Sequence, residues 1–272
     1  MSEALAATTF SFRRVGAMVL RYLYLLRGSW PRIAELVYWP VVQMILWGLI
    51  TKFFVTNSSW IAQAGGVLIA GVLLWDVLVR SQFGIAVSFL EEVWSRNLGQ
   101  LFVTPLRPYE LMLSFAAMSL LRTLIGVVPA ALLAIPLYSY SIFTLGLPLL
   151  AFFVNLMIFG WAIGLAISGC ILRYGLGAEN LAWLAIFAFA PISGVYYPVA
   201  ILPHWLQPVA WLLPSVYVFE GMRAVMFEHI FRSDLILRAL ALNALYLTLG
   251  GATFLAFFRA VRRRGLLLQM GE

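Results

Sequence analysis

Lysine is almost absent from this sequence. Lys52 is the one lysine in 272 residues, and the other 17 of the 18 basic residues are arginines. A phosphate-binding P-loop needs a glycine-rich turn followed by lysine, whereas Lys52 follows the run Leu49-Ile-Thr51 inside an apolar stretch. The sequence therefore excludes ATP hydrolysis through a P-loop in this chain.

Cysteine and histidine are also scarce. Cys170 is the single cysteine, so no disulfide can form within the chain. The two histidines, His204 and His229, do not have the spacing of a metal site. No arrangement of Ser, His and Asp or of Cys and His suggests a nucleophile, and no paired carboxylates lie in the apolar runs. We expect neither catalysis nor a metal site in this chain.

Charge is the third scarcity. Only 11% of the residues are charged and 63% are hydrophobic, against about 25% and about 45–50% in soluble domains. The mean hydropathy is +0.96. Water does not solvate so much apolar surface, and lipid is the solvent that this composition requires. We therefore expect residues 1–272 to form a single all-α membrane domain without a soluble domain.

The apolar runs are long enough to cross a bilayer, which takes about 20 residues per helix. The clear runs cover 33–55, 66–89, 110–136, 146–172, a fifth beginning near Leu181, and a last at 236–258. Pro40 is expected to kink the first run. The pattern predicts six transmembrane helices.

The ends of the chain are basic. Arginines cluster before the first run and after the last one, at Arg259, Arg262, Arg263 and Arg264. This pattern is typical of cytoplasmic flanks of membrane proteins rather than of nucleic-acid binding. Both termini are then cytoplasmic, and the number of crossings is even. Residues 198–235, which prolines interrupt repeatedly, are therefore expected to form an external re-entrant segment of short helices.

Residues 10–30 alternate basic and apolar positions. The apolar residues recur at spacings of three and four, which places them on one helical face: Phe12, Val15, Met18, Val19, Tyr22 and Leu26. We predict an amphipathic helix in the membrane interface, with its arginines among lipid head groups. Arginines at 13, 14, 21 and 27 interrupt any apolar core of a signal peptide.

Residues 90–108 are the longest polar stretch near the middle of the chain. Glu91, Glu92 and Arg96 have the spacing of a charge pair on one helix face. Three further residues, Leu98, Leu101 and Phe102, form a compact apolar face. A short cytoplasmic helix with an exposed apolar face suits docking to another protein, and an ordinary solvated loop is the alternative.

The order of motifs resembles the type-2 ATP-binding cassette (ABC) permeases. One motif is Arg96-Asn-Leu-Gly-Gln-Leu101, preceded by acidic residues and followed by Thr104-Pro-Leu106. Another is Pro191-Ile-Ser-Gly-Val-Tyr-Tyr-Pro198, followed by Leu202-Pro-His-Trp-Leu-Gln-Pro208. These motifs are similar to the family's cytoplasmic loop between the second and third spans and to its external re-entrant segment.

The resemblance implies a permease that forms a homodimer and binds two ATPase subunits, which carry MgATP. It implies that the 90–108 segment is the ATPase-coupling helix, with candidate residues Glu91, Glu92, Arg96, Asn97, Leu98, Gln100, Leu101, Thr104 and Pro105. It also implies an external gate, for which the candidates are Pro191, Gly194, Pro198, Pro203, Glu220 and Arg223. No cofactor is expected in this chain itself.

Polar residues inside the apolar runs are a further set of candidates. Asp76 and Arg80 are four residues apart on one face of the second run. Because a lone charge in the bilayer costs about 2.5–3.5 kcal/mol on insertion scales, such residues are expected to pair and to face the bundle interior. Arg122 and Asn155 are similar candidates. The sequence leaves open whether these residues are structural, at a helix or dimer interface, or line a substrate pathway.

The function that the resemblance implies is export across the inner (cytoplasmic) membrane by a multi-pass permease. The cargo would be a lipid-like, glycan or drug-like amphiphile, moved out of the cytoplasm or the inner leaflet. The alternative is an ion-coupled secondary transporter or channel without an ATPase partner, for which the charges at Asp76, Arg80 and Arg122 speak.

Overall fold

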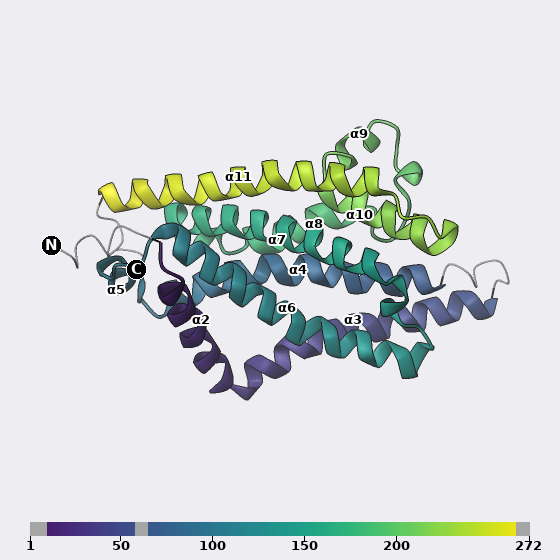
Figure 1. Ribbon diagram of the computed structural model, residues 1–272, viewed down its shortest axis with the longest axis horizontal. Helices are drawn as coiled ribbons and strands as arrows, with labels where there is room; N and C mark the ends of the chain where they lie inside the picture. The colour runs from purple at the N-terminus through teal and green to yellow at the C-terminus, as the bar shows by residue number, and fades with distance from the viewer. Residues whose placement is uncertain (1–9, 58–64, 265–272) are drawn as a thin grey trace.

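A computed structural model describes residues 10–57 and 65–264 of the chain as helices joined by loops (Figure 1), without a strand in those residues. The long helices are α3 (Trp30–Asn57), α4 (Gly65–Trp94), α6 (Pro108–Tyr138), α7 (Leu147–Tyr174) and α11 (Ser233–Arg264). The shorter helices are α2 (Phe12–Arg27), α5 (Leu98–Val103), α8 (Leu181–Phe189), α9 (Gln207–Ala210) and α10 (Pro214–Arg223). Single turns of 3-10 or π helix are η2 (Ile142–Leu145), η3 (Leu176–Ala178), η4 (Ala190–Ile192), η5 (Val199–Ile201) and η6 (Ala224–Glu228).

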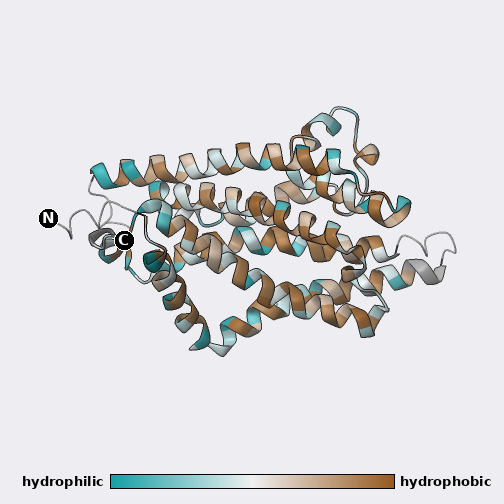
Figure 2. Cartoon of the chain, viewed as in Figure 1, coloured by the Kyte–Doolittle hydropathy of each residue, from teal (hydrophilic) through white to brown (hydrophobic). Residues whose placement is uncertain are grey.

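Five helices among the described residues are long and apolar enough to cross a membrane. The candidate membrane spans within these helices are Trp30–Phe53, Gly66–Trp94, Pro108–Tyr138, Leu147–Tyr174 and Ser233–Arg263. Each contains the corresponding predicted run or nearly all of it. Figure 2 shows hydrophobic residues along the middle of these helices and more hydrophilic colour toward their ends.

The prediction of six continuous spans is not confirmed. The predicted fifth span begins at Leu181 as expected, but α8 has only 9 residues, which is about 14 Å of helix against about 30 Å of hydrocarbon. The chain still passes from the end where α7 finishes to the end where α11 starts (Figure 1). It does so through α8 and the short elements after it, because Pro191 and Pro198 interrupt the helix.

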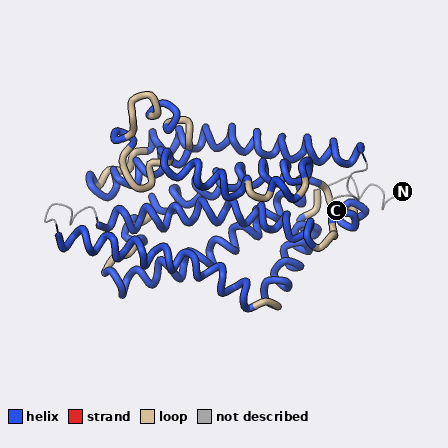
Figure 3. The backbone as a smooth tube through the Cα atoms, turned by 180° about the vertical axis from the view of Figure 1, so that it is seen from behind, coloured by secondary structure: helices blue, strands red, loops and turns tan. Residues whose placement is uncertain are grey.

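Residues 198–235 contain η5, α9, α10 and η6, followed by the start of α11. Figure 3 shows loops gathered with these short helices at one end of the bundle. A position of this segment on the outer side of a membrane stays a prediction.

The helix α4 is the centre of the bundle. It packs against α6 and α7, while α11 covers α7 and α3 lies against α6 and α4. Within its most apolar window, 78% of α4 is buried, compared with 17% for α3. Residues on α4 therefore contact protein on most sides, whereas α3 leaves most of its surface to lipid or to another chain.

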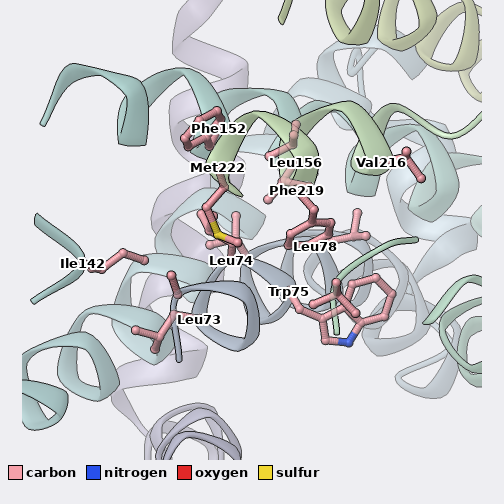
Figure 4. Close-up of a cluster of buried hydrophobic side chains, with 14 of the residues drawn as sticks. Leu73, Leu74, Trp75, Leu78, Ile142, Phe152, Leu156, Val216, Phe219 and Met222 are labelled. Carbon is pink, nitrogen blue, oxygen red and sulfur yellow. The ribbon is translucent and has the colours of Figure 1, made fainter. Parts of the chain in front are cut away.

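Two apolar cores lie at opposite ends of this bundle. We call the end that carries α2, α5 and the last turns of α11 the basic end, and the end that carries α9 the opposite end (Figure 1). The core of the opposite end includes Leu74 and Leu78 of α4 against Phe219 and Met222 of α10, as Figure 4 shows. The core of the basic end gathers side chains of α2, α4, α5, α6, α7 and α11.

Small residues permit the close contact of α4 and α7. A Cβ at Gly160 would overlap the Ser81 hydroxyl, and one at Gly164 would lie 2.7 Å from the carbonyl oxygen of Gln82. Such small residues let helices approach closely where no hydrophobic effect drives them together. Gly160 and Gly164 therefore serve the close packing of α7 on α4.

The predicted amphipathic helix is present as α2. Val15, Met18, Tyr22 and Leu26 are its buried residues, as the spacing predicts, while Phe12 is 75% exposed. The buried side of α2 packs on α6 and belongs to the core of the basic end.

Candidate functional site

The segment predicted to contact a partner runs from the end of α4 to the start of α6. The helix α4 ends at Trp94, and Arg96 has a left-handed backbone with φ 53°. The chain turns there and forms α5. It then continues in an extended conformation through Thr104 to Arg107, the N-cap of α6.

The prediction of an exposed apolar face on this segment is wrong. Leu98 and Leu101 are 4% and 8% exposed and lie in the core of the basic end. The side chain of Phe102 lies outside the described residues. Burying a leucine is worth roughly 1.5–3 kcal/mol, so a short helix beside an apolar core turns its leucines inward. The side that faces outward consists of Trp94, Ser95, Arg96, Gln100, Thr104 and Pro105.

Glu92 is an internal anchor rather than a surface charge. It is 1% exposed and accepts hydrogen bonds from both Nη atoms of Arg21, at 2.6 and 3.2 Å. The Tyr22 hydroxyl donates to it at 2.5 Å and the Asn97 amide at 2.7 Å. Burial, with the charge of Glu92 next, raises the pKa of the Tyr22 hydroxyl above its usual value. Glu92 therefore ties α2 to α4 and to the turn before α5.

Glu110 makes the corresponding anchor after α5. It is fully buried and accepts from Nε and Nη2 of Arg14 at 2.8 and 2.5 Å. The backbone amides of Ser11 and Arg107 donate to it at 2.9 and 3.0 Å. As the third residue of α6, its carboxylate also lies where the helix dipole favours negative charge.

Arg14 and Arg21 are seven residues apart, about two turns of α2. Because Glu92 precedes α5 and Glu110 follows it, α2 is bound to both flanks of the segment. We call Arg14, Arg21, Glu92 and Glu110 the α2 clamp. The sequence reasoning missed Glu110, although its position just after Pro108 is typical of the first turn of a helix.

Glu91 connects three helices. Its carboxylate binds Arg122 of α6 at 2.9 Å and Arg32 of α3 at 3.4 Å. The expected pairing on one helix face placed Glu91 and Glu92 with Arg96. The structure gives both carboxylates partners from other elements, because Arg96 lies beyond the end of α4 and no longer continues its helical face.

The polar residues inside the bundle divide into two groups. Arg122 is bound by Glu91, and Asn155 of α7 accepts from the Asn243 amide of α11 at 2.9 Å. These two serve helix contacts. Asp76 and Arg80 behave differently, since no ion pair joins them in the described part of the chain, and the expected pair is wrong. Asp76 is buried and Arg80 is half-buried, and each has a buried polar atom without a hydrogen bond, Oδ2 of Asp76 and Nε of Arg80.

The side chain of Arg80 lies against α6. A Cβ at Gly126 would lie 2.9 Å from its Cδ and Nε atoms. The Arg80 side chain therefore packs on α6 and makes no ion pair with Asp76 in the described residues, although the two residues are one turn apart on α4.

At the opposite end, Arg223 of α10 holds the hairpin 193–199. Arg223 is 8% exposed and donates to the carbonyl oxygens of Gly194 and Tyr197 at 2.6 and 3.2 Å. Its ion pair with Glu220 spans 3.2 Å, and Glu220 accepts from the Val199 amide at 2.8 Å. The structure thus brings together three of the candidate gate residues, and Gly194 has the φ of +73° that glycine readily adopts.

The three prolines among the gate candidates shape the backbone beside this contact. The carbonyl oxygen of Pro191 accepts from the Tyr197 hydroxyl at 2.5 Å, Pro198 precedes η5, and Pro203 accepts from the Leu206 amide at 2.8 Å. The hairpin also lies against α4, since a Cβ at Gly71 would be 3.0 Å from the Val195 carbonyl oxygen.

Within residues 10–57 and 65–264, no three His, Cys, Asp or Glu side chains gather as metal ligands would. The chemistry of the described residues is therefore that of helix anchoring at the basic end, a clamped hairpin at the opposite end and unpaired charges between them.

The chain is similar to known membrane transport proteins. The family model described as "ABC-2 type transporter" matches residues 22–227. The chain is similar to the inner membrane transport permease YadH of Escherichia coli K12, with 23% identity over 195 residues, which cover 68% of this chain and 72% of the relative. The protein of the same name from Shigella flexneri matches with the same identity and coverage.

Proposed function

The chain belongs to the ABC-2 type transporter family, and we propose that it is the membrane-spanning permease subunit of an ATP-driven exporter. ATP hydrolysis is assigned to a separate ABC ATPase subunit, which binds MgATP, and a second copy of this chain completes a homodimer. The cargo is an amphiphile of the lipid-like, glycan or drug-like kind, moved outward from the cytoplasm or the inner leaflet. The basic end faces the cytoplasm, and both termini are cytoplasmic.

The observation that carries this proposal is the form of the α5 segment. One side of it is buried by Leu98 and Leu101, and the other presents Arg96, Gln100 and Thr104 to the outside. A rigidly held helix with an exposed polar face is suited to transmit a push from a partner, since its own packing does not need to rearrange.

The contacts around α5 connect it to the helices that a motion of the ATPase would have to move. The α2 clamp fixes both flanks of the segment to α2, and Glu91 connects the same flank to α3 and α6 through Arg32 and Arg122. Charge-assisted hydrogen bonds of this kind are shorter and stronger than neutral ones. A displacement of α5 by a closing ATPase is therefore expected to move α2, α4 and α6 together.

The opposite end supplies a candidate gate. The hairpin 193–199 is held by Arg223 and Glu220 of α10 and lies against α4. Since α4 joins the coupling segment at one end and the hairpin at the other, we propose that it links ATP-driven motion at the basic end to opening at the opposite end.

The test is co-purification in detergent with the candidate ABC ATPase. The wild type is expected to retain the ATPase, and Gln100→Arg is expected to weaken its retention at least about tenfold, or about 1.4 kcal/mol. The matched control is His204→Arg, which adds the same side chain at an exposed position of the opposite end and is expected to retain the ATPase.

Full retention by Gln100→Arg would place the ATPase contact elsewhere. If the wild type itself retains no ATPase, ATP coupling is abandoned, and ion-driven transport involving Asp76 and Arg80 takes its place.

A further inference from the structure

Asp76 is a buried acidic residue, and one of its carboxyl oxygens has no hydrogen-bond partner in the described residues. Asp76 is 6% exposed, and the oxygen without a partner there is Oδ2. Its neighbours Trp75 and Val77 belong to the apolar core of the opposite end. A charged group buried without a partner is costly, and ionisable residues inside membrane helices mark candidate binding sites.

The charges around Asp76 do not occupy its free oxygen. The guanidinium of Arg80 is within electrostatic reach of Asp76 on its own helix and of the exposed Glu35 on α3, but no ion pair joins it to Asp76 in the described residues. Arg122 of α6 is bound to Glu91. Oδ2 of Asp76 therefore remains available to a cationic ligand.

Aromatic rings lie near Asp76. Trp47 of α3 stacks on Tyr196 of the hairpin, with ring centroids 4.6 Å apart and planes at 18°. Tyr196 is itself within electrostatic reach of Asp76. Aromatic faces next to a carboxylate attract organic cations, through their quadrupoles and through apolar contact.

A metal ion or an anion fits less well. Divalent metal ions need several oxygen or nitrogen ligands, and no group of three such side chains exists among the described residues. An anion would meet the buried carboxylate of Asp76.

We propose that Asp76 recognises the cationic group of an organic amphiphile, whose apolar body lies against Trp47 and Tyr196. Access follows from separation of α3 from the hairpin, which breaks the stack of Trp47 on Tyr196 and uncovers Asp76. The proposal rests on the transport function proposed above, because it names the class of substrate, a cationic amphiphile.

The test uses two probes of almost the same shape and opposite charge. Tetraphenylphosphonium is the cation and tetraphenylborate the anion, and binding of each to the purified full-length permease is measured by equilibrium dialysis in detergent. The wild type is expected to bind the cation, and Asp76→Asn to bind it at least about tenfold more weakly, a loss of about 1.4 kcal/mol. Affinity for the anion is expected not to fall in Asp76→Asn.

Two further variants make the result specific. Asp234→Asn removes a carboxylate that is exposed at the start of α11 and is expected to bind the cation as the wild type does. Asp76→Glu keeps the charge and is expected to keep most of the affinity, which separates loss of charge from loss of folding if Asp76→Asn elutes aberrantly from a sizing column.

Equal affinity of wild type and Asp76→Asn for the cation, or no binding of the cation to the wild type, overturns the proposal. Because binding is measured on the permease without its ATPase, this failure is independent of the co-purification test. An exporter that retains its ATPase yet fails here transports another class of substrate.

Discussion

Arg21 of α2 donates two hydrogen bonds to the carboxylate of Glu92 on α4, at 2.6 and 3.2 Å. This contact ties an amphipathic helix to the central helix of the bundle just before the segment proposed to meet the ATPase. Glu92 is buried and Arg21 is partly exposed. Removing the carboxylate of Glu92 therefore destabilises the protein more than removing the guanidinium of Arg21.

We expect Glu92→Gln to lower the thermal unfolding midpoint more than Arg21→Gln does, since Glu92 has three donors around it and Arg21 keeps access to solvent. The coupling energy of the two changes is expected to be about 1 kcal/mol, reduced by solvent from the value of a fully buried pair. The measurement is a double-mutant cycle from unfolding curves in detergent. Glu228→Gln, at an exposed position, is the control, and additive effects of the two changes would contradict the clamp.

Much of the helical architecture was predictable because it follows from hydropathy alone. The apolar runs near 33–55 and 110–136 are continuous, and a bilayer leaves such runs no alternative to helix. The buried face of α2 was also predictable, because its apolar residues recur every three or four positions.

The site was less predictable because its contacts join residues far apart in sequence. Glu92 meets Arg21 and Glu110 meets Arg14 at separations of 71 and 96 residues, and spacing along one helix favours only local pairs such as Glu92 with Arg96. The same limit explains why the ion pair expected between Asp76 and Arg80 is not present. They share a helix face, but the contact of the Arg80 side chain with Gly126 of α6 depends on how two helices pack.

The length of α8 was not predictable from composition. Residues 181–192 are as apolar as a span, and the prolines at 191 and 198 mark where a helix breaks without fixing where the chain goes next.

Close packing of α4 on α7 predicts a sharp contrast between two glycines. Gly160→Ala is expected to destabilise the protein by about 1–3 kcal/mol, because its methyl group would overlap Ser81 of α4. Gly16→Ala on α2 has open space and is expected to be neutral or to stabilise by up to about 1 kcal/mol through helix propensity. Thermal unfolding of both variants in the same detergent measures the two effects. Equal effects would show that α4 and α7 are packed less closely in the protein than the structure has them.

The hairpin at the opposite end predicts a local change in hydrogen exchange. In Glu220→Ala the Val199 amide loses its acceptor and Arg223 loses its ion pair. Exchange of the peptide covering 193–200 is therefore expected to accelerate while exchange of α7 does not.

Arg232→Ala is the control for this measurement, because its ion pair with Asp234 is half-exposed and exposed pairs contribute little. Unchanged exchange of 193–200 in Glu220→Ala would mean that packing against α4 alone holds the hairpin.

Orientation and burial can be tested together, because Cys170 is the one cysteine of the chain and can be replaced by alanine. In that background, Gln100→Cys is expected to react quickly with a membrane-impermeant maleimide, since Gln100 is exposed, and Leu98→Cys slowly, since Leu98 is 4% exposed. Ile201→Cys, at an exposed position of the opposite end, is expected to react only from the other side of the membrane.

In inside-out vesicles, where the cytoplasmic face is accessible, labelling should therefore be high at position 100 and low at 201, and intact cells should show the reverse. Labelling of both positions from one side would overturn the proposed crossing through α8 and the short helices, because only two crossings, α6 and α7, would then separate α5 from α9 and place them on the same face. Fast labelling at position 98 would instead mean that the α5 segment leaves the core of the basic end in the membrane.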